Sequence, residues 1–229
     1  MTPVVLLPGL MCDARLWGPV MGAFSGRAVL HAPLVEADTT DALAAAVLAL
    51  APPRFALAGL SMGGIVAMAI LAAAPERVER LALLDTNPRA ELEAVRAVRA
   101  RQIARARSGD LAGVMREEMK PNYLADGPGM ETVLDLCMDM ALALGPEVFA
   151  RQSAALRDRP DRCDALAAYG GPALVLMGEE DRLCPRDRHE QMHALLVRSQ
   201  FVVVPGAGHL PTLERPPETT AALGRWLEA

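Results

Sequence analysis

A serine flanked by glycines, placed where an apolar strand turns into an apolar helix, constrains this chain more than any other feature. The stretch GLSMGG (59–64) follows the apolar run 55–58 and precedes the Ala-rich segment 65–74. Gly-x-Ser-x-Gly in this setting indicates a nucleophile elbow, a sharp turn that holds the Ser61 hydroxyl clear of the sheet. A Cβ atom at Gly59 or Gly63 would collide with the neighbouring strand or helix, so both positions require glycine. The Met62 N–H would remain free at a helix N-terminus, where it can donate to a developing oxyanion.

Apolar runs alternate with helical patterns over much of the chain. The expected strands are 4–7, 28–34, 55–58, 81–84, 173–178 and 201–204, and the expected helices between them are 41–50, 65–74, 185–197 and 217–227. Such alternation is typical of βαβ units joined by right-handed crossovers. It predicts an α/β fold, with a mostly parallel sheet of about six strands flanked by helices.

The alternation lapses between residues 87 and 168, where the pattern is mostly helical and includes an arginine-studded amphipathic segment at 90–106. We therefore expect a core formed by residues 1–86 and 169–229. Residues 87–168 would form a helical cap, inserted after the strand that follows the elbow helix. Met115, Met119 and Met138 belong to this insertion, and methionine side chains adapt to irregular apolar surroundings. They suit a packed helical bundle or the underside of a lid over a substrate pocket, and the two readings are compatible.

Composition excludes several classes of function. The net charge is −5 and the arginines are scattered, which argues against nucleic-acid binding. Prolines and charges interrupt the longest apolar stretches, so no membrane span is expected. No charged segment or small-residue cleavage site follows Met1, which argues against a signal peptide. The four cysteines are far apart and form no CxxC pair, as expected of reduced thiols in a cytoplasmic protein.

A serine hydroxyl needs an adjacent base, and that base needs a group to orient it. Asp181 and His209 each follow a predicted strand, and the carboxyl ends of parallel strands meet at one edge of the sheet. The order Ser61, Asp181, His209 is the one expected of this type of elbow. Asp85 also ends a strand close to the elbow and is the alternative orienting acid.

The loop after the first strand is expected to supply a second oxyanion donor. Pro8-Gly9-Leu10 occupies this loop, and Gly9 permits close approach of the backbone. We therefore expect the Leu10 N–H to point inward beside that of Met62.

Five segments together resemble the α/β-hydrolase-fold superfamily, in its small esterase- and lactonase-like branch with a helical cap. They are LLPGLMCDARLW, LAGLSMGG, LALLDTNPRAE, LVLMGEEDRLCP and VVVPGAGHLPTLERPPE, and they cover the core in order, whereas the cap matches only loosely. The resemblance implies Ser61 as nucleophile, Asp181 as orienting acid and His209 as base, with oxyanion amides from Leu10 and Met62. Two features depart from the family pattern. Pro8-Gly9 stands in place of the common His-Gly, and the sheet begins almost at Met1, without the usual N-terminal hairpin.

A competing motif is His189-Glu190-Gln191-Met192-His193, which matches the H-E-x-x-H signature of zinc proteases on a predicted helix. The two histidines would share a helix face, but a third ligand is required. Ser199 stands where the extended signature has its third histidine. Glu214 is another candidate, but a strand and a turn separate it from the helix. We expect no metal at this site.

The sequence thus predicts a cofactor-free serine hydrolase that cleaves a small carboxylic ester, thioester or lactone through an acyl-Ser61 intermediate. The alternatives are a lyase or carbon–carbon bond hydrolase with the same triad, and a non-catalytic ligand-binding module. The expected partner is a small-molecule substrate, with neither nucleic acid nor membrane, and the chain would be a monomer or homodimer. Arg151 and Arg157 are candidates to pair with a substrate carboxylate. The full set of expected substrate-binding residues is Trp17, Met115, Met119, Met138 and Arg151.

Overall fold

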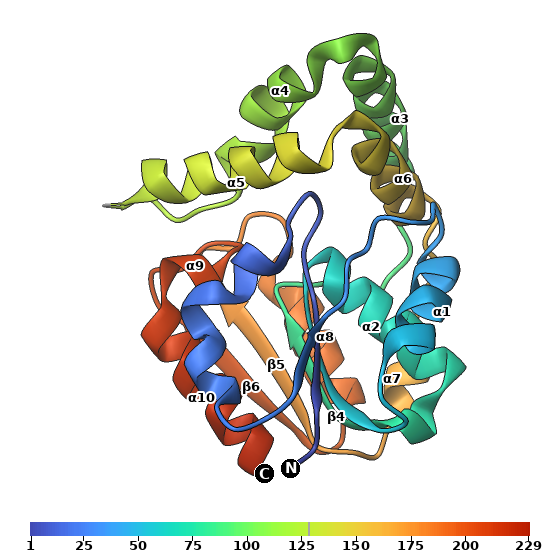
Figure 1. Cartoon of the computed structure of the whole chain (residues 1–229), viewed down its shortest axis with the longest axis vertical. Coiled ribbons are helices and arrows are strands. Elements are labelled where there is room, and N and C mark those ends of the chain that lie inside the picture. Colours follow the sequence, from blue (N-terminus) through green and yellow to red (C-terminus); the bar gives the residue numbers. More distant parts are fainter. Residues whose placement is uncertain (128) are drawn as a thin grey trace.

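Six parallel strands form one sheet in the computed structural model, which describes residues 1–127 and 129–229 (Figure 1). The strands are β1 (Val4–Leu7), β2 (Val29–His31), β3 (Phe55–Leu60), β4 (Val78–Leu84), β5 (Ala173–Gly178) and β6 (Ser199–Val204). Their order across the sheet is β2-β1-β3-β4-β5-β6. The predicted α/β class with about six parallel strands is confirmed.

The burial of each strand explains how closely its predicted bounds match the observed ones. Every residue of β1, β3 and β5 is buried, because each of these strands has a neighbour on both sides and helices cover both faces of the sheet. The edge strand β2 is half-buried, and it is shorter than the predicted run 28–34. Strand β4 begins at Val78, three residues before the predicted start. The prediction missed these residues because the half-buried Glu79 and Arg80 interrupt the apolar pattern of the strand.

Helices flank the sheet on both faces (Figure 1). One layer contains α1, α2, α7 and α8, which contact one another in series, and α10 packs on the other face with the 3-10 helix η1. These helices are η1 (Ala14–Phe24), α1 (Thr40–Leu50), α2 (Met62–Ala73), α7 (Cys163–Ala167), α8 (Arg186–Leu195), α9 (Pro211–Glu214) and α10 (Pro216–Glu228), with a short η2 (Pro75–Arg77) before β4. Helix α2 is buried from Met62 through Leu71, as expected of the apolar helix that follows the elbow.

The part of the chain between β4 and α7 lies beyond the carboxyl ends of the strands (Figure 1). Its helices are α3 (Glu93–Arg105), η3 (Ala106–Asp110), α4 (Leu111–Gly113), η4 (Val114–Met119), η5 (Lys120–Asn122), α5 (Met130–Leu144) and α6 (Pro146–Arg157). Helix α3 starts three residues later than the predicted 90–106, because residues 89–92 form an irregular segment that contributes to the pocket described below. The division into a core and a cap stays a prediction.

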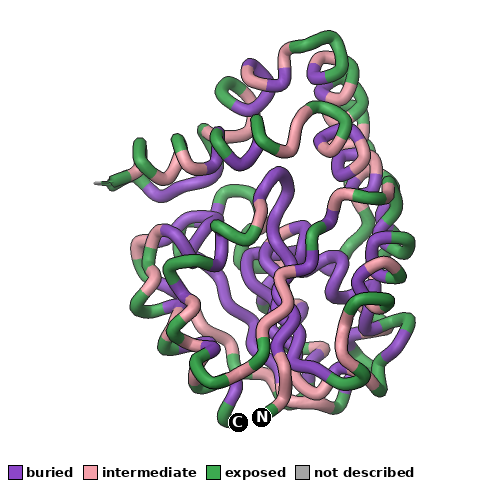
Figure 2. Tube along the Cα trace, in the orientation of Figure 1, coloured by how far each residue is buried: buried purple, intermediate pink, exposed green. Residues whose placement is uncertain are grey.

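The hydrophobic core follows the sheet and the helices that cover it, and buried positions also continue into the segment above the sheet (Figure 2). Trp17 and Trp226 are among the largest fully buried side chains. All four cysteines are free thiols. Among the described helices, none combines the length and the apolar content that a membrane crossing requires.

Candidate active site

The elbow places Ser61 between the end of β3 and the first turn of α2 in a strained backbone conformation. Its φ and ψ angles are 54° and −114°, a region that residues with a Cβ atom rarely occupy. Two hydrogen bonds hold this turn. The Ser61 N–H donates to the Leu84 carbonyl at 2.9 Å, and the Thr86 hydroxyl donates to the Ser61 carbonyl at 2.7 Å.

The predicted need for glycine on both sides of Ser61 is confirmed by the backbone contacts. A Cβ atom at Gly59 would stand 2.6 Å from the Gly64 nitrogen of α2, and one at Gly63 would stand 2.6 Å from the Leu7 carbonyl carbon of β1. Both distances are shorter than real Cβ contacts allow. The helix can therefore start this close to the sheet only because these side chains are absent.

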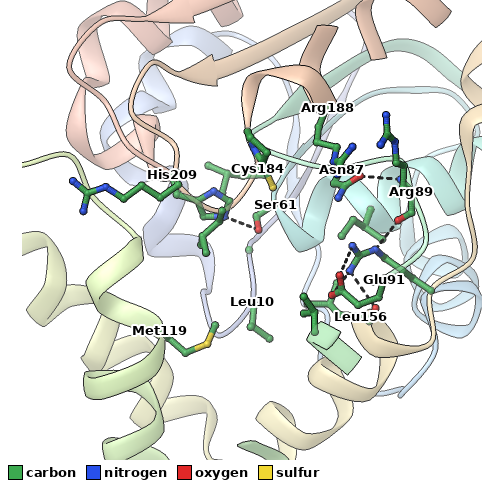
Figure 3. Close-up of a pocket in the computed structure, with 18 of the residues that line it drawn as sticks. Leu10, Ser61, Asn87, Arg89, Glu91, Met119, Leu156, Cys184, Arg188 and His209 are labelled. Atoms are coloured by element: carbon green, nitrogen blue, oxygen red, sulfur yellow. Dashed lines mark hydrogen bonds and ion pairs between the residues drawn. The ribbon is translucent and has the colours of Figure 1, made fainter. Parts of the chain in front are cut away.

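Ser61, His209 and Asp181 form a continuous chain of hydrogen bonds, although they come from three separate loops. His209 Nε2 lies 2.8 Å from Ser61 Oγ, and Nδ1 lies 2.9 and 3.0 Å from the two carboxylate oxygens of Asp181. His209 and Asp181 are buried, whereas Ser61 is partly exposed to the cavity (Figure 3). The convergence expected from the strand order is therefore present.

The environment of Asp181 keeps its carboxylate ionised. Burial alone would raise its pKa, but the adjacent His209 and the hydrogen bonds that Asp181 accepts outweigh this effect and lower the pKa. Besides His209, the backbone N–H groups of Leu183 and Cys184 donate to Asp181 Oδ1 at 2.8 and 3.1 Å. A carboxylate held in this way can orient the imidazole and stabilise a positive charge on it.

Asp85, the alternative acid, occupies a different position behind this chain of hydrogen bonds. Its Oδ1 accepts the Gly178 N–H at 2.8 Å, while its buried Oδ2 has no partner among the described residues. Burial, followed by the nearby charge of Asp181, raises the pKa of Asp85 well above its ordinary value. The environment of Asp85 therefore favours the protonated, neutral form of its side chain, whereas the carboxylate that contacts the imidazole is that of Asp181.

The two residues expected to supply oxyanion amides are both near Ser61, since Met62 follows it directly in the chain and Leu10 lines the same cavity as Ser61. The Met62 N–H is in the first turn of α2, which leaves it without an intrahelical acceptor, and among the described residues Leu10 N–H donates to no backbone or side-chain acceptor. The loop that carries Leu10 is fixed from a distance. Gln152 of α6 accepts the Met11 N–H at 2.8 Å and donates to the Leu34 carbonyl at 2.9 Å. Gln152 thus supplies the hydrogen bonds for a loop in which Pro8-Gly9 replaces the common His-Gly.

The loop of His209 is held by Glu214, which the sequence suggested only as a possible metal ligand. Its carboxylate accepts the backbone N–H groups of Gly208 and Leu210, each at 2.9 Å, and that of Ala125 at 2.8 Å. In addition, the His209 N–H donates to the Tyr123 carbonyl at 2.7 Å. Glu214 therefore positions the loop, and within the part of the chain that the structure describes its carboxylate bonds only to backbone amides.

The residues of the H-E-x-x-H motif point to different surroundings. His189 is fully buried, with Nδ1 3.4 Å from the Pro185 carbonyl, whereas the exposed His193 has Nδ1 2.7 Å from the Ser199 hydroxyl. Glu190 pairs with Arg186 on the surface. Among the described residues, the side chains close enough to share a metal ion are Asp181 with Cys184 and His209, and Asp85 with Asp181 and His189; neither group contains both motif histidines.

A cavity of about 390 Å³ opens onto Ser61 and His209, within the usual range for small-molecule sites. Figure 3 shows Ser61 between His209 on one side and Glu91 with Leu156 on the other, with Leu10 and Met119 along another wall. Of the five residues expected to bind substrate, Met119 lines this cavity.

The other four residues expected to bind substrate do not line the cavity. Trp17, Met115 and Met138 are buried in the hydrophobic core. Arg151 donates to the Val35 carbonyl at 2.8 Å. Arg157, the other arginine considered as a carboxylate partner, pairs with the adjacent Asp158. Residues that sequence reasoning missed include Gln152, Glu214 and the arginines that do line the cavity, because their roles depend on contacts between segments far apart in the chain.

Comparisons with known proteins agree with this fold. A model of an alpha/beta hydrolase family matches residues 4–223. A thermophilic esterase from Thermogutta terrifontis, solved with malate bound, is 31% identical, with a TM-score of 0.90 over 100% of this chain and 90% of that one. The pimeloyl-[acyl-carrier protein] methyl ester esterase of Xanthomonas campestris pv. campestris is 27% identical over 99% of this chain and 95% of its own length. The enol-lactonase of Burkholderia xenovorans LB400 shares the fold, with 23% identity and a TM-score of 0.87. The match covers 100% of this chain and 92% of the enol-lactonase.

Proposed function

Because this chain belongs to the alpha/beta hydrolase family, we propose that it is a serine esterase whose active site is centred on Ser61. The observation that carries the proposal is the hydrogen-bonded series from Asp181 through His209 to Ser61. The names of the related esterase and methyl ester esterase support cleavage of a carboxylic ester. Thioesters and lactones undergo the same acyl transfer and belong to the proposed substrate range.

In the proposed first step, Ser61 Oγ attacks the ester carbonyl carbon while His209 Nε2 takes the hydroxyl proton. Asp181 accepts a hydrogen bond from His209 Nδ1, which keeps Nε2 free to act as the base. The N–H groups of Leu10 and Met62 would stabilise the tetrahedral oxyanion by about 3–4 kcal/mol each. Collapse of this intermediate releases the alcohol, which takes the proton from His209, and leaves an acyl-Ser61 ester.

In the second step, His209 removes a proton from water, and the resulting hydroxide attacks the acyl-Ser61 carbonyl. The carboxylic acid leaves and Ser61 regains its proton, so the cycle consumes one water molecule and needs no cofactor. Residues 1–86 and 169–229 would carry the reacting groups. Residues 87–168 would act as a cap that limits substrate size, because Glu91, Val95 and Met119 line the cavity from this segment.

The test is a time course with p-nitrophenyl acetate and butyrate for the wild type, Ser61→Ala and the control Ser25→Ala, which changes an exposed serine. We expect turnover in the wild type and in Ser25→Ala, unaffected by a chelator, and a loss of about 10³-fold or more in Ser61→Ala. Labelling by a fluorophosphonate, located by peptide mass spectrometry, should fall on Ser61. Activity retained in Ser61→Ala would refute the proposal, and inhibition by the chelator would point instead to a metal site.

A further inference from the structure

The cavity beside Ser61 carries more positive than negative charge. Its lining includes one acidic side chain, that of Glu91. The basic side chains that line it are Arg89, Arg99, Arg159, Arg182 and Arg188. Arg89 and Arg182 are exposed, and they bond to the neutral Gln191 and to Asp126. Arg188, whose side chain is 17% exposed, is paired with Asp187, which balances its charge. Among the largely buried basic side chains, the excess charge therefore depends on Arg99 and Arg159.

Glu91 is the only acidic partner of Arg99 and of Arg159 among the described residues. Arg159 Nη1 and Nη2 lie 2.8 and 3.0 Å from the two Glu91 oxygens, and Arg99 Nε lies 2.9 Å from Glu91 Oε2. The exposed fractions of the three side chains are 5% for Arg159, 8% for Glu91 and 16% for Arg99. Burial alone would raise the pKa of Glu91, but the two arginines outweigh it and lower the pKa, so Glu91 is an anion. Two cations and one anion leave one net positive charge largely removed from water.

The two arginines differ in how many of their donors are occupied. Arg159 donates to Glu91 through both terminal nitrogens, to the Arg89 carbonyl through Nε and to the Leu156 carbonyl through Nη1. Among the residues that the structure describes, only Glu91 accepts a hydrogen bond from Arg99, and it accepts from Nε. Both terminal nitrogens of Arg99 are thus available to a molecule in the cavity.

A guanidinium with two free terminal nitrogens matches a carboxylate in shape, because it can donate two parallel hydrogen bonds. The charge balance also favours a carboxylate, since one monoanion neutralises the single excess charge, whereas a phosphate dianion would reverse it. An ester bound at Ser61 would then be placed with a second, acidic end at Arg99. Apolar side chains that line the same cavity, including Leu10, Leu92 and Val95, suit a carbon chain that joins the ester to the acid.

We propose that Arg99 binds a carboxylate of the substrate, so that this enzyme prefers esters or lactones that carry a free acid group. The predicted substrate preference rests on the proposed esterase function, because it is measured as catalysis. The predicted binding of an anion at Arg99 does not depend on that function. It replaces Arg151 and Arg157, which bond elsewhere, with a residue that faces the cavity.

The experiment compares monomethyl esters of four- to seven-carbon dicarboxylic acids with the methyl esters of the corresponding primary monoamides. The enzymes are the wild type, Arg99→Met and Arg101→Met, the last of which removes the same charge from the exposed side of α3. We expect the wild type to prefer the acid at one or more chain lengths. The ratio of kcat/KM for acid over amide should fall by about 10- to 100-fold in Arg99→Met and stay unchanged in Arg101→Met. Glu91 keeps Arg159 as its partner in Arg99→Met, so the remaining pair is balanced in charge.

A binding measurement separates this inference from the proposed function. Calorimetry on Ser61→Ala should give tighter binding of the acid esters than of the amides, and adding Arg99→Met should remove the difference. Arg99-dependent binding without turnover of any ester would refute the esterase and uphold the anion site. Turnover with no preference for the acid at any chain length, or an equal loss for both substrates in Arg99→Met, would overturn the anion site and leave the esterase intact.

Discussion

Replacing Gly63 with alanine tests the idea that the elbow depends on the close approach of α2 to β1. The new Cβ atom would stand 2.6 Å from the Leu7 carbonyl carbon and 2.8 Å from the Pro8 oxygen, and it would also meet the Leu7 oxygen. Ordinary contacts begin near 3.4 Å, so the backbone of β1 and the first turn of α2 must separate by about 1 Å. Leu7 is fully buried and β1 lies between β2 and β3, so this strand has little freedom to move.

Intrinsic propensity predicts the opposite sign for this substitution. Alanine is favoured over glycine within a helix by about 1 kcal/mol, whereas forcing an extra methyl group into a packed site costs about 1–3 kcal/mol, and more where the obstacle is backbone. We expect Gly63→Ala to lower the free energy of unfolding by about 2 kcal/mol, which corresponds to a decrease in Tm of about 4–8 °C for a chain of this length. Esterase activity should fall by about 100-fold, because the displaced loop carries Leu10 and a shift of 1 Å misplaces an oxyanion donor.

Gly224→Ala is the matched control. Gly224 lies within α10, and a Cβ atom there would meet no atom within 4 Å. We expect this variant to be more stable than the wild type by about 0.5–1 kcal/mol, with unchanged activity. Urea denaturation provides the free energies, and kcat/KM for p-nitrophenyl acetate provides the activity. If Gly63→Ala were as stable and active as Gly224→Ala, the steric reasoning about the elbow would be refuted.

Two further predictions concern the buried ionisable groups around Asp181. Asp181→Asn should reduce kcat by about 10³–10⁴-fold, because Asp181 orients the imidazole. Asp85→Asn replaces a neutral carboxylic acid with an isosteric neutral amide and should reduce kcat by less than about 10-fold. If steady-state assays gave the reverse order, Asp85 would be the orienting acid. Burial lowers the pKa of His189 to about 4, so the unfolded chain binds more protons than the native protein between about pH 6.5 and 4. The free energy of unfolding should therefore decrease by up to about 3 kcal/mol as the pH falls through this range, as measured by urea denaturation at several pH values. His189→Gln should flatten this dependence and the exposed His193→Gln should leave it unchanged, and an equal effect of the two would show that His189 is not its source.

The order of the elements and the elbow itself were accessible from the sequence because they depend on short-range interactions. A buried parallel strand is a continuous apolar run, and a turn that brings a helix against a strand needs glycine at fixed positions on either side of Ser61. Parallel pairing then brings the residues that follow each strand to one edge of the sheet. For this reason Asp181 and His209 could be expected near Ser61 although 120 and 148 residues separate them from it in the chain.

The sequence favoured Asp181 over Asp85, but both follow strands, and only the tertiary structure shows which carboxylate contacts the imidazole, namely that of Asp181. It also decided the lining of the cavity. The sequence suggested Arg151 as a carboxylate partner, yet the cavity contains Arg99 and Arg159, which Glu91 holds together. Gln152 fixes the loop of Leu10 from 141 positions away along the chain. Local periodicity does not reveal such contacts, because they depend on how the segment between β4 and β5 packs over the sheet. In the sequence alone, an arginine on the surface cannot be told from one that lines the cavity.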